Sequence, residues 1–274
     1  MSGEHSNPSK GDPKEQTGSS EKRNAFTELL APKRKQPKHA TKTPSDRNAA
    51  KGKTAFGVRD GLGAYIAKPE TYPDAVVYHN DDFVAIHDMF PKSSLHLLLL
   101  PRDQTKTRMH PFDAFEDAEF LEKVKAETRT LREFAAVELR RKYGKDSAQD
   151  QPIQAALSAD PPPDELPQGR DWAQEIVVGV HAVPSMNHLH VHVLSVDRYS
   201  ERLKHRKHYN SFSTPFFVPI EDFPLAEDDV RRNPTKEGYL KRDFTCWRCS
   251  RGFGNRFAEL KQHLEQEFKE WKKL

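Results

Sequence analysis

The 274-residue chain contains little cysteine and no long hydrophobic run. No stretch of about 18 apolar residues occurs, which argues against a membrane-spanning helix, and the N-terminus lacks the apolar segment of a secretory signal peptide. We therefore expect a soluble, intracellular protein without a membrane partner. Both cysteines, Cys246 and Cys249, belong to one Cys-x-x-Cys motif. In a reducing compartment this motif indicates a metal or redox pair and not a structural disulfide.

Apolar residues are also scarce, at 35% of the chain against 31% charged residues, and there are 20 prolines. Such a composition predicts that part of the chain stays outside any core. Residues 1–60 hold thirteen Lys/Arg and seven Asp/Glu, and residues 199–274 hold sixteen and twelve, whereas residues 143–175 hold two and seven. Basic flanks around a nearly neutral centre suit a phosphate backbone that is contacted from both sides.

The first 55 residues are rich in Ser, Pro, Lys, Gly and Thr, which predicts a disordered, basic N-terminal region. Within it, Phe26, Leu29 and Leu30 have the spacing of a short helix that docks in the groove of a partner protein. A chance apolar cluster explains these residues equally well. The Pro-Lys-Arg-Lys run at 32–35 resembles a nuclear import signal, so we expect a nuclear protein.

Residues 62–196 show the patterns of a folded domain. Helices are predicted at 62–67 and 115–143, and strands at 83–87, 96–101, 175–183 and 189–196. The apolar positions of the long helix are Phe120, Val124, Leu131, Phe134 and Leu139. Residues 144–170 are expected to form a surface insertion. Strands grouped around a helix, without regular βαβ alternation, predict an α+β fold with a mainly antiparallel sheet.

Three histidines alternate in the last predicted strand. Because every second residue of a strand faces the same side, His188, His190 and His192 should line one face. Leu189, Val191 and Val193 should point into the core. Buried polar groups are costly without a use, which disfavours an incidental polar face. A zinc site is a sharper alternative, since His-x-His on a strand can bind zinc.

The segment at 86–101 reads Ile-His-Asp-Met-Phe-Pro-Lys-Ser-Ser-Leu-His-Leu-Leu-Leu-Leu-Pro, and the segment at 184–194 reads Pro-Ser-Met-Asn-His-Leu-His-Val-His-Val-Leu. Together they resemble the two halves of a histidine-triad nucleotide-binding domain. The resemblance implies that a nucleotide lies between them and that His190 is the nucleophile. A neutral imidazole near pH 7 can attack phosphorus, and the phosphoramidate that results has a good leaving group once it is protonated.

The same resemblance assigns roles to the residues around the nucleotide. Ile86 and Met89 would pack on the adenine, and Asp88 would hold the ribose hydroxyls. Hydrogen-bond donors would surround the α-phosphate and stabilise its developing charge, the role that usually dominates such reactions. These donors would be His96, Ser185 and His192, with His188 completing the triad.

Further features resemble the aprataxin family more closely than the small nucleotide-only enzymes. His181, in the segment Gly-Val-His-Ala-Val-Pro-Ser at 179–185, could protonate or bind the leaving DNA phosphate. A basic run follows the triad strand, and its candidate phosphate contacts are Lys204, Lys207, His208, Tyr209 and Ser211. A solvated basic loop is the alternative. Other DNA-binding candidates are Arg59, Lys92, Ser93 and Phe56. Phe56 or Tyr65 could stack on an exposed base, although burial in the core is the favoured expectation for Tyr65.

The C-terminal part completes the aprataxin-like pattern. Cys-x2-Cys, thirteen residues and His-x3-Glu reproduce the spacing of a ββα zinc finger, with Cys246, Cys249, His263 and Glu267 as ligands of a structural zinc ion. Water or Glu265 is the alternative to Glu267. Phe257 and Leu260 are expected in the small core of the finger. Three basic residues are then free for DNA, namely Arg251, Arg256 and Lys261.

The resemblance covers residues 56–274 and implies a histidine-triad catalytic domain at 56–218 and a zinc-finger DNA-binding domain at 219–274. It implies an enzyme that removes AMP from 5′-adenylated DNA ends, the products of aborted ligation, through a covalent histidine–AMP intermediate in single-strand break repair. We expect a monomer with no catalytic cofactor. Unlike the longer animal aprataxins, the chain is expected to have no folded domain of forkhead-associated type within residues 1–55, and recruitment by phosphopeptides is therefore not expected.

Two other functions remain open at this stage. The first is a general histidine-triad hydrolase of small AMP conjugates or dinucleotides, with a finger that binds RNA or protein. The second is a non-enzymatic zinc-finger adaptor that binds nucleic acid through an inert fold.

Overall fold

The computed structural model describes residues 59–161 and 163–274. The expectations for the N-terminal region, the cluster of Phe26, Leu29 and Leu30, the run at 32–35 and Phe56 lie outside these residues. Within the described part, every helix is too short or too polar to span a bilayer.

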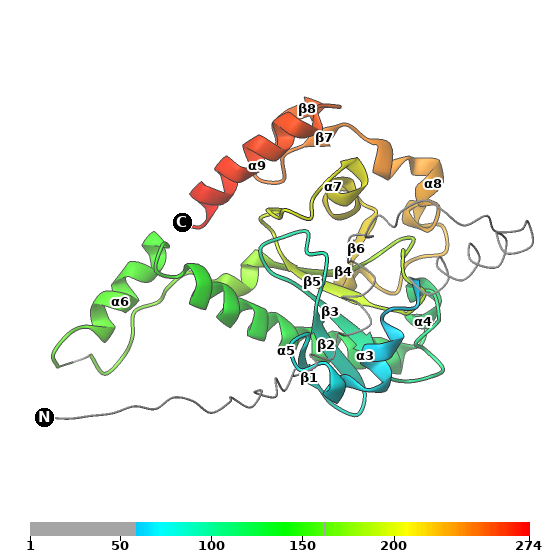
Figure 1. The fold of residues 1–274 in the computed structure, drawn as a ribbon, viewed down its shortest axis with the longest axis horizontal. Coiled ribbons are helices and arrows are strands. Elements are labelled where there is room, and N and C mark those ends of the chain that lie inside the picture. Colours follow the sequence, from blue (N-terminus) through cyan, green and yellow to red (C-terminus); the bar gives the residue numbers. More distant parts are fainter. Residues whose placement is uncertain (1–58, 162) are drawn as a thin grey trace, which may run out of the picture. The chain divides into compact units, whose positions relative to one another are not determined.

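A six-stranded antiparallel sheet forms the centre of the fold (Figure 1). In sequence its strands are β1 (Val76–His79), β2 (Phe83–His87), β3 (His96–Pro101), β4 (Ile176–His181), β5 (Val191–Ser195) and β6 (Phe217–Pro219). Their order across the sheet is β1-β2-β3-β5-β4-β6, and every neighbouring pair is antiparallel. The predicted α+β class with an antiparallel sheet is confirmed. The short edge strands β1 and β6 were not predicted, because neither shows an apolar alternation long enough to read.

The helices and the small hairpin surround this sheet. The α-helices are α3 (Gly63–Ala67), α4 (Pro111–Ala114), α5 (Ala118–Tyr143), α6 (Gln151–Leu157), α7 (Arg206–Ser213), α8 (Pro234–Glu237) and α9 (Phe257–Trp271), and the hairpin strands are β7 (Phe244–Thr245) and β8 (Gly252–Gly254). Single 3-10 turns lie at Pro69–Thr71, Ala148–Asp150, Trp172–Glu175, Ile220–Asp222, Val230–Arg232 and Tyr239–Lys241.

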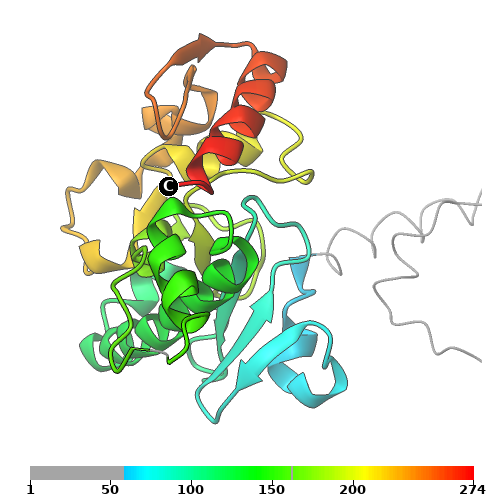
Figure 2. The ribbon, with the colours of Figure 1, turned by 90° about the vertical axis from the view of Figure 1, so that its left-hand side faces the viewer.

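The long helix α5 covers one face of the sheet (Figures 1 and 2). It begins where the Asp117 side chain accepts a hydrogen bond from the Phe120 amide, the usual way to satisfy a free donor at a helix start. Its buried stripe runs through Leu131, Ala135 and Leu139. Phe134, which we expected in this stripe, is instead 36% exposed. Ala135 takes the place next to Leu131 because it lies four residues on, closer to the centre of the buried face.

The other face of the sheet carries the two halves of a site. At one end α3 packs on β2 and β3 through a cluster that includes Ile66, Ile86 and Leu98. At the other end Phe212 of α7 packs on β5 and β6. Between these two helices the sheet presents the histidines His96 of β3 and His192 of β5. This part of the face therefore carries imidazoles and not apolar side chains.

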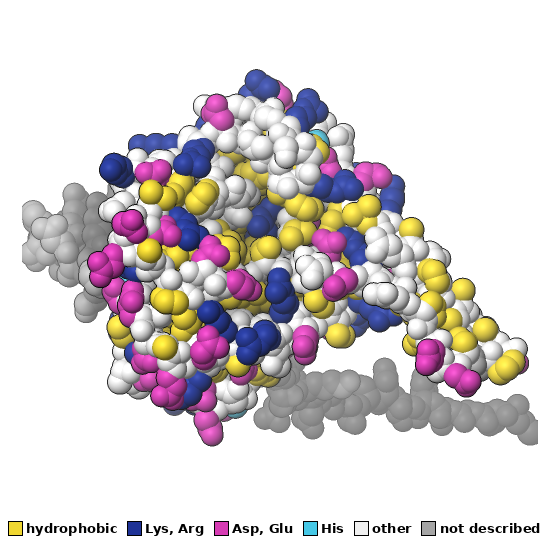
Figure 3. Space-filling model, turned by 180° about the vertical axis from the view of Figure 1, so that it is seen from behind, with side chains coloured by type: hydrophobic (Ala, Val, Ile, Leu, Met, Phe, Trp, Pro, Cys, Tyr) yellow, Lys and Arg dark blue, Asp and Glu magenta, His cyan; other side chains and the backbone are white. Residues whose placement is uncertain are grey.

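The insertion at 144–170 forms an arm that includes α6 (Figure 1). Its base is part of the core, because the buried Asp150 carboxylate accepts hydrogen bonds from the Arg170 amide and the Trp172 indole. Its distal part exposes Leu157 and Leu166, and Figure 3 shows apolar and acidic side chains gathered on the arm. The expectation of a surface insertion therefore fits the distal part, while its base is structural.

The finger packs against the rest of the molecule in two places. Leu203 and Tyr209 share a buried cluster with the hairpin and α9, including Phe253 and Leu260. At the far end of α9, Trp271 enters the main core, donates to Glu175 over 2.7 Å and has the Arg170 guanidinium 4.8 Å from its ring. The packing is continuous across the boundary expected after residue 218, so the finger helix is held at both ends.

Candidate active site and metal centre

The three histidines of the last predicted strand are all buried, and none is more than 6% exposed. His192 lies in β5, His190 comes directly before that strand, and His188 ends the bend that leads into it. The intervening Leu189, Val191 and Val193 belong to the main core. The alternation read from the sequence therefore holds across the start of the strand, and it puts the imidazoles on the face between α3 and α7.

The protons of His190 are fixed by the backbone. Its Nδ1 atom lies 2.7 Å from the carbonyl oxygen of His188. Because a carbonyl only accepts, Nδ1 carries the hydrogen, and Nε2 keeps its lone pair. Burial lowers the pKa of His190 below the usual value, although the His188 carbonyl opposes that shift. His190 therefore presents an uncharged nitrogen nucleophile at neutral pH.

A hydrogen-bond chain fixes the proton of His192 in the opposite sense. The Lys92 amide donates to His96 Nδ1 over 3.1 Å, so the His96 hydrogen is on Nε2. His96 Nε2 lies 3.0 Å from His192 Nδ1 and donates to it. The His192 hydrogen is then on Nε2, a buried atom with no hydrogen-bond partner among the described residues. The site thus holds a free donor next to the free lone pair of His190, whose ring centroid is 4.9 Å from that of His192.

Burial keeps these imidazoles neutral. It lowers the pKa of His96 to about 4, with the charges of Lys92 and Arg198 acting in the same direction against Asp88. It also lowers the pKa of His192 well below the ordinary value. Both shifts have the same main cause, which is the cost of placing a cation where water cannot solvate it.

Asp88 begins the turn between β2 and β3. Its Oδ1 atom accepts from the Phe90 amide over 2.7 Å, and its Oδ2 atom lies 3.3 Å from His96 Nδ1. The carboxylate remains partly exposed, which leaves it able to accept from a ligand hydroxyl. Met89 next to it is half-buried. Ile86, by contrast, is only 2% exposed beneath α3, so it forms the floor of this part of the site.

The alternative of a zinc site at the histidines requires imidazole nitrogens that converge on one point and are not hydrogen-bonded to each other. Among the described residues, the donor atoms of His188, His190 and His192 do not together form a group that could hold a metal ion. The set whose donor atoms all lie within 4.8 Å of one another is Asp88, His96 and His192. In that set His96 Nε2 and His192 Nδ1 are hydrogen-bonded to each other. This arrangement uses the imidazoles as a proton-ordered chain.

His181 ends β4 beside the triad. Its ring centroid is 4.5 Å from those of His192 and Phe212, and its Nε2 atom is buried without a partner in the described part of the chain. Burial and the neighbouring histidines lower its pKa well below the usual value. His181 is thus a neutral second donor or acceptor beside His192, next to the expected phosphate.

The segment that enters the domain closes the site from the α3 side. Arg59 Nε donates to the Ser185 carbonyl over 3.0 Å, and the Arg59 carbonyl accepts from the Asn187 amide over 2.9 Å. Gly63 lies against His188 so closely that an added Cβ would come within 2.8 Å of its Nε2 atom. Asn187 and Gly63 were missed in the sequence, because a single Asn or Gly gives no signal of what it packs against.

The basic run after the triad contains helix α7 and is not simply a loop. Lys204 and Lys207 are exposed, Ser211 is half-buried and the Lys204 amide donates to His208 Nδ1 over 3.2 Å. Burial, together with the charges of His205 and of nearby lysines, lowers the pKa of His208 to about 4. Burial also lowers the pKa of Lys92, whose amine donates to the Phe90 carbonyl. Cations and neutral donors therefore rim the histidine cluster on the α7 side.

Two residues that we expected at the DNA are instead buried. Tyr209 is 1% exposed, and its hydroxyl donates to the Thr245 carbonyl over 2.8 Å and accepts from the Trp247 amide over 3.1 Å. Ser93 is also 1% exposed and lies beneath Arg198. The assignment of both to DNA contact is corrected, because their side chains are occupied inside the protein. Tyr209 holds the hairpin of the finger.

Asp197, for which no sequence signal was found, fixes the turn between β2 and β3 to the end of β5. Its carboxylate accepts from the Ser94 amide and hydroxyl over 3.0 and 2.7 Å, from the Tyr199 amide over 2.7 Å and from the Ser195 hydroxyl. The residue is fully buried. An isolated aspartate after a strand is common, so its role becomes visible only when the chain is folded.

The four expected zinc ligands lie together at the base of the finger. Cys249 Sγ is 3.1 Å from His263 Nε2, which is 3.1 Å from Glu267 Oε1, and one donor atom from each of the four residues lies within 4.8 Å of the others. Both cysteines are free thiols. Two thiolates, an imidazole and a carboxylate are suitable ligands for a tetrahedral zinc ion. Glu265 pairs with Lys269 over 2.9 Å instead, so Glu267 is the fourth ligand that fits.

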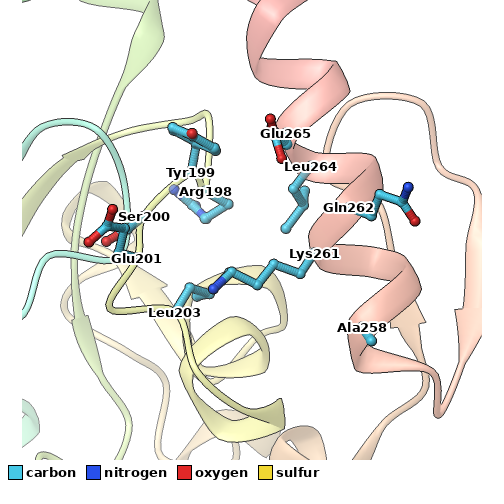
Figure 4. Close-up of a pocket in the computed structure, with 10 residues that line it drawn as sticks. All are labelled: Arg198, Tyr199, Ser200, Glu201, Leu203, Ala258, Lys261, Gln262, Leu264 and Glu265. Atoms are coloured by element: carbon cyan, nitrogen blue, oxygen red, sulfur yellow. The ribbon is translucent and has the colours of Figure 1, made fainter.

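A separate cavity of about 360 Å³ lies between the loop after β5 and α9 (Figure 4). It is lined by Arg198, Tyr199, Ser200, Glu201, Leu203, Ala258, Lys261, Gln262, Leu264 and Glu265. None of these is a triad histidine. Lys261 extends across the gap from α9 towards the loop (Figure 4). One of the three finger cations expected to be free thus faces this cavity, while Arg256 pairs with Glu259 over 2.8 Å.

Similarity to known proteins covers both parts of the chain. A HIT domain matches residues 70–199, and a C2HE/C2H2/C2HC zinc-binding finger matches residues 213–270. The chain is 37% identical to the aprataxin-like protein of Schizosaccharomyces pombe over 78% of this chain and 82% of that protein. It is 38% identical to the aprataxin-like protein of Saccharomyces cerevisiae over 77% of this chain and 95% of that protein. A solved structure of the aprataxin ortholog Hnt3 in complex with DNA superposes with a TM-score of 0.64 at 36% identity, over 78% of this chain and 96% of that chain.

Proposed function

The chain belongs to the aprataxin family, and from this and its site we propose that it removes AMP from the 5′-adenylated ends of DNA. The observation that carries the proposal is the pairing of His190 Nε2, a free lone pair, with His192 Nε2–H, a free donor. Nucleophilic attack on a phosphate requires both the lone pair and the donor at the same time. The first attacks the phosphorus, and the second stabilises the charge on its oxygens.

In the first step His190 Nε2 attacks the α-phosphorus of the adenylated end. A P–N bond forms, the phosphoanhydride P–O bond breaks, and the DNA leaves with its 5′-phosphate. In the second step water attacks the same phosphorus, and the P–N bond breaks with its electron pair returning to His190 Nε2. AMP leaves with the oxygen and one proton of the water, and the other proton passes to solvent. Metal coordination by His190 would compete with the first step for the same lone pair.

The protein's donors hold the phosphate during both steps. His192 Nε2–H faces it directly, and the chain through His96 from the Lys92 amide keeps that hydrogen in place. Because the donors are neutral and already ordered, little reorganisation accompanies the reaction, which is where most electrostatic catalysis arises. Asp88 is suited to accept the ribose hydroxyls, and Ser185 to complete the donor set. His181 is the candidate donor to the departing DNA phosphate.

The surroundings of the site favour a DNA substrate over a small dinucleotide. Lys204 and Lys207 are exposed around α7, and Lys92, in the turn after Asp88, lies near enough to His208 to lower the pKa of that residue. A small dinucleotide offers these cations only a short run of phosphates, whereas a DNA strand offers a continuous one. The similar aprataxin ortholog was solved in complex with DNA, and the finger adds Lys261 and other cations. We propose that these cations hold the DNA half, that zinc in the finger is structural and that the protein acts in nuclear DNA single-strand break repair as a monomer.

Turnover on a duplex with a 5′-adenylated nick tests this function. The expected result is stoichiometric AMP release with higher catalytic efficiency than on a diadenosine polyphosphate, and with affinity that falls steeply as salt increases. Equal efficiency on both substrates with the same salt response would support the general hydrolase instead. DNA binding without any AMP release would support the adaptor.

A further inference from the structure

The metal cluster of the finger has an unusual charge. In a Cys2His2 finger the two thiolates balance the zinc ion, whereas Cys246, Cys249, His263 and Glu267 add a carboxylate. The cluster with zinc therefore carries one excess negative charge. A carboxylate also offers two oxygens in place of one ring nitrogen, so something must decide which oxygen faces the metal.

Arg248, one of the two residues between the cysteines along the chain, can both offset this charge and select the oxygen. Its Nη1 atom lies 2.7 Å from Glu267 Oε2, while Glu267 Oε1 lies 3.1 Å from His263 Nε2 on the metal side. The Glu267 side chain is 12% exposed and that of Arg248 is 30% exposed. The two oxygens of Glu267 are thus divided, one towards the cluster and one towards the guanidinium.

We propose that Arg248 is the positioning residue that allows Glu267 to act as a zinc ligand in this finger. The guanidinium holds Oε2, which presents Oε1 alone to the metal, and its positive charge offsets the excess negative charge of the cluster. Outer partners of this kind orient metal ligands and often change metal affinity by roughly 10- to 100-fold. The inference concerns the finger alone and does not rest on the proposed enzymatic function.

The rival role for Arg248 is a contact to a DNA phosphate. Its Nη1 atom already donates to Glu267, which disfavours that role. Arg256 provides a matched comparison on the same finger. It also forms an ion pair with a glutamate, Glu259, at 2.8 Å, but both side chains are more than half exposed and neither belongs to the cluster.

The test is the rate at which zinc-loaded full-length protein loses zinc to an excess of a chromogenic chelator. Arg248→Ala should release zinc about tenfold faster or more, and Arg256→Ala should match the wild type. Arg248→Lys should fall between them, because an ammonium supplies charge without the planar fork. The absorption bands of the cobalt(II)-loaded protein should change with Arg248→Ala, because they report the ligand set directly.

Glu267→His separates this role from a general effect on folding. With a neutral imidazole as fourth ligand there is no extra charge and no second oxygen, so adding Arg248→Ala to Glu267→His should change zinc release less than about twofold. Equal acceleration in both backgrounds would overturn the proposal. So would wild-type zinc release by Arg248→Ala together with weaker DNA binding and a smaller salt slope, which would make Arg248 a phosphate contact.

Discussion

The chain holds two clusters of histidine and carboxylate side chains that are built in opposite ways. In the histidine cluster backbone groups set the proton of His190 and, through His96, that of His192, and the rings are buried. In the finger the donor atoms of Cys249, His263 and Glu267 converge on one point and are partly exposed. The first arrangement is ready to receive a phosphate. The second needs a cation to hold its anionic donors together.

The two clusters are nevertheless mechanically joined. Tyr209, next to the histidine site on α7, holds the hairpin that carries the cysteines. Trp271 fixes the far end of α9 in the main core. Isolated zinc fingers unfold without metal, but here we expect metal loss to disorder the cysteine hairpin while the end of α9 stays docked.

The largest expected effect is on the nucleophile. His190→Ala removes the lone pair that forms the P–N bond, so AMP release should fall by about 10⁴-fold or more, the scale seen when a covalent nucleophile is removed. The melting temperature should change little. His79→Ala, which changes an exposed histidine on β1, is the control and should keep full activity. Substantial AMP release by the His190 variant would give the nucleophilic role to another group.

A second prediction concerns the junction between the two regions. Trp271→Ala empties a fully buried site between Arg170, Trp172 and Tyr143 and should lower the free energy of unfolding by about 3–5 kcal/mol. Chemical denaturation measures it. Leu157→Ala, at an exposed position on the arm, should cost almost nothing. Similar small losses for both variants would show that α9 is only loosely attached.

The third prediction uses pH to probe the buried imidazoles. The pKa of His96 is lowered to about 4 in the folded protein against an ordinary 6.5. Above pH 6.5 the imidazole is neutral in the folded and the unfolded state, so it does not change the free energy of unfolding. Below it the unfolded chain takes up the proton first, so the folded state loses stability as the pH falls to 4, by about 3 kcal/mol from His96 alone.

Urea denaturation across pH 4–7 measures this slope. His96→Asn should make the slope shallower, and Leu157→Ala, at an exposed apolar position, should leave it unchanged. Unfolding free energy that stays constant from pH 7 to pH 4 would contradict the burial of neutral histidines.

The fourth prediction tests whether the histidine cluster keeps its activity when the finger loses its zinc. Cys249→Ser removes one thiolate ligand, so the protein should lose zinc and bind the DNA substrate about tenfold more weakly, because finger cations are no longer held in place. Hydrolysis of a small AMP conjugate should keep near-normal rates, since the histidine cluster is organised by the backbone. Parallel loss of both activities would mean that the two clusters fold as one metal-dependent unit.

The smallest expected effect is at a single phosphate contact. Lys204→Ala removes an exposed cation next to His208 and should weaken DNA binding severalfold, while the slope of log affinity against log salt falls by about 0.9 if one phosphate is contacted. Fluorescence anisotropy at several salt concentrations measures both. Lys68→Ala, at an exposed position at the end of α3, is the comparison. Identical slopes for the two variants would remove Lys204 from the DNA contacts.

Much of this architecture could be predicted because its signals are local. The strands at 83–87 and 96–101 could be placed to the residue, since each is a short apolar run between turn residues. The alternation of His188, His190 and His192 indicated a shared face. The spacing of the Cys-x-x-Cys and His-x3-Glu pairs also predicted the zinc cluster that the structure brings together.

What could not be predicted depends on contacts between distant segments. Tyr209 looked like a DNA contact because basic residues surround it in the chain, yet its hydroxyl binds the backbone of Thr245, far along the sequence. Asp197 and Gly63 give no pattern at all. Phe134 fits the apolar period of a helix, but packing of α5 against the sheet buries Ala135 and leaves Phe134 partly exposed.

The central claim is that His190 Nε2 forms a covalent bond to the AMP phosphorus. It is tested most directly by mixing the enzyme with 5′-adenylated nicked DNA, quenching within the first turnover under conditions that preserve P–N bonds and analysing the digested protein by mass spectrometry. We predict one adenylyl group on the peptide containing His190, present during turnover and absent from His190→Ala. AMP release that proceeds at full rate with no adduct, or with an adduct on another residue, would contradict the account.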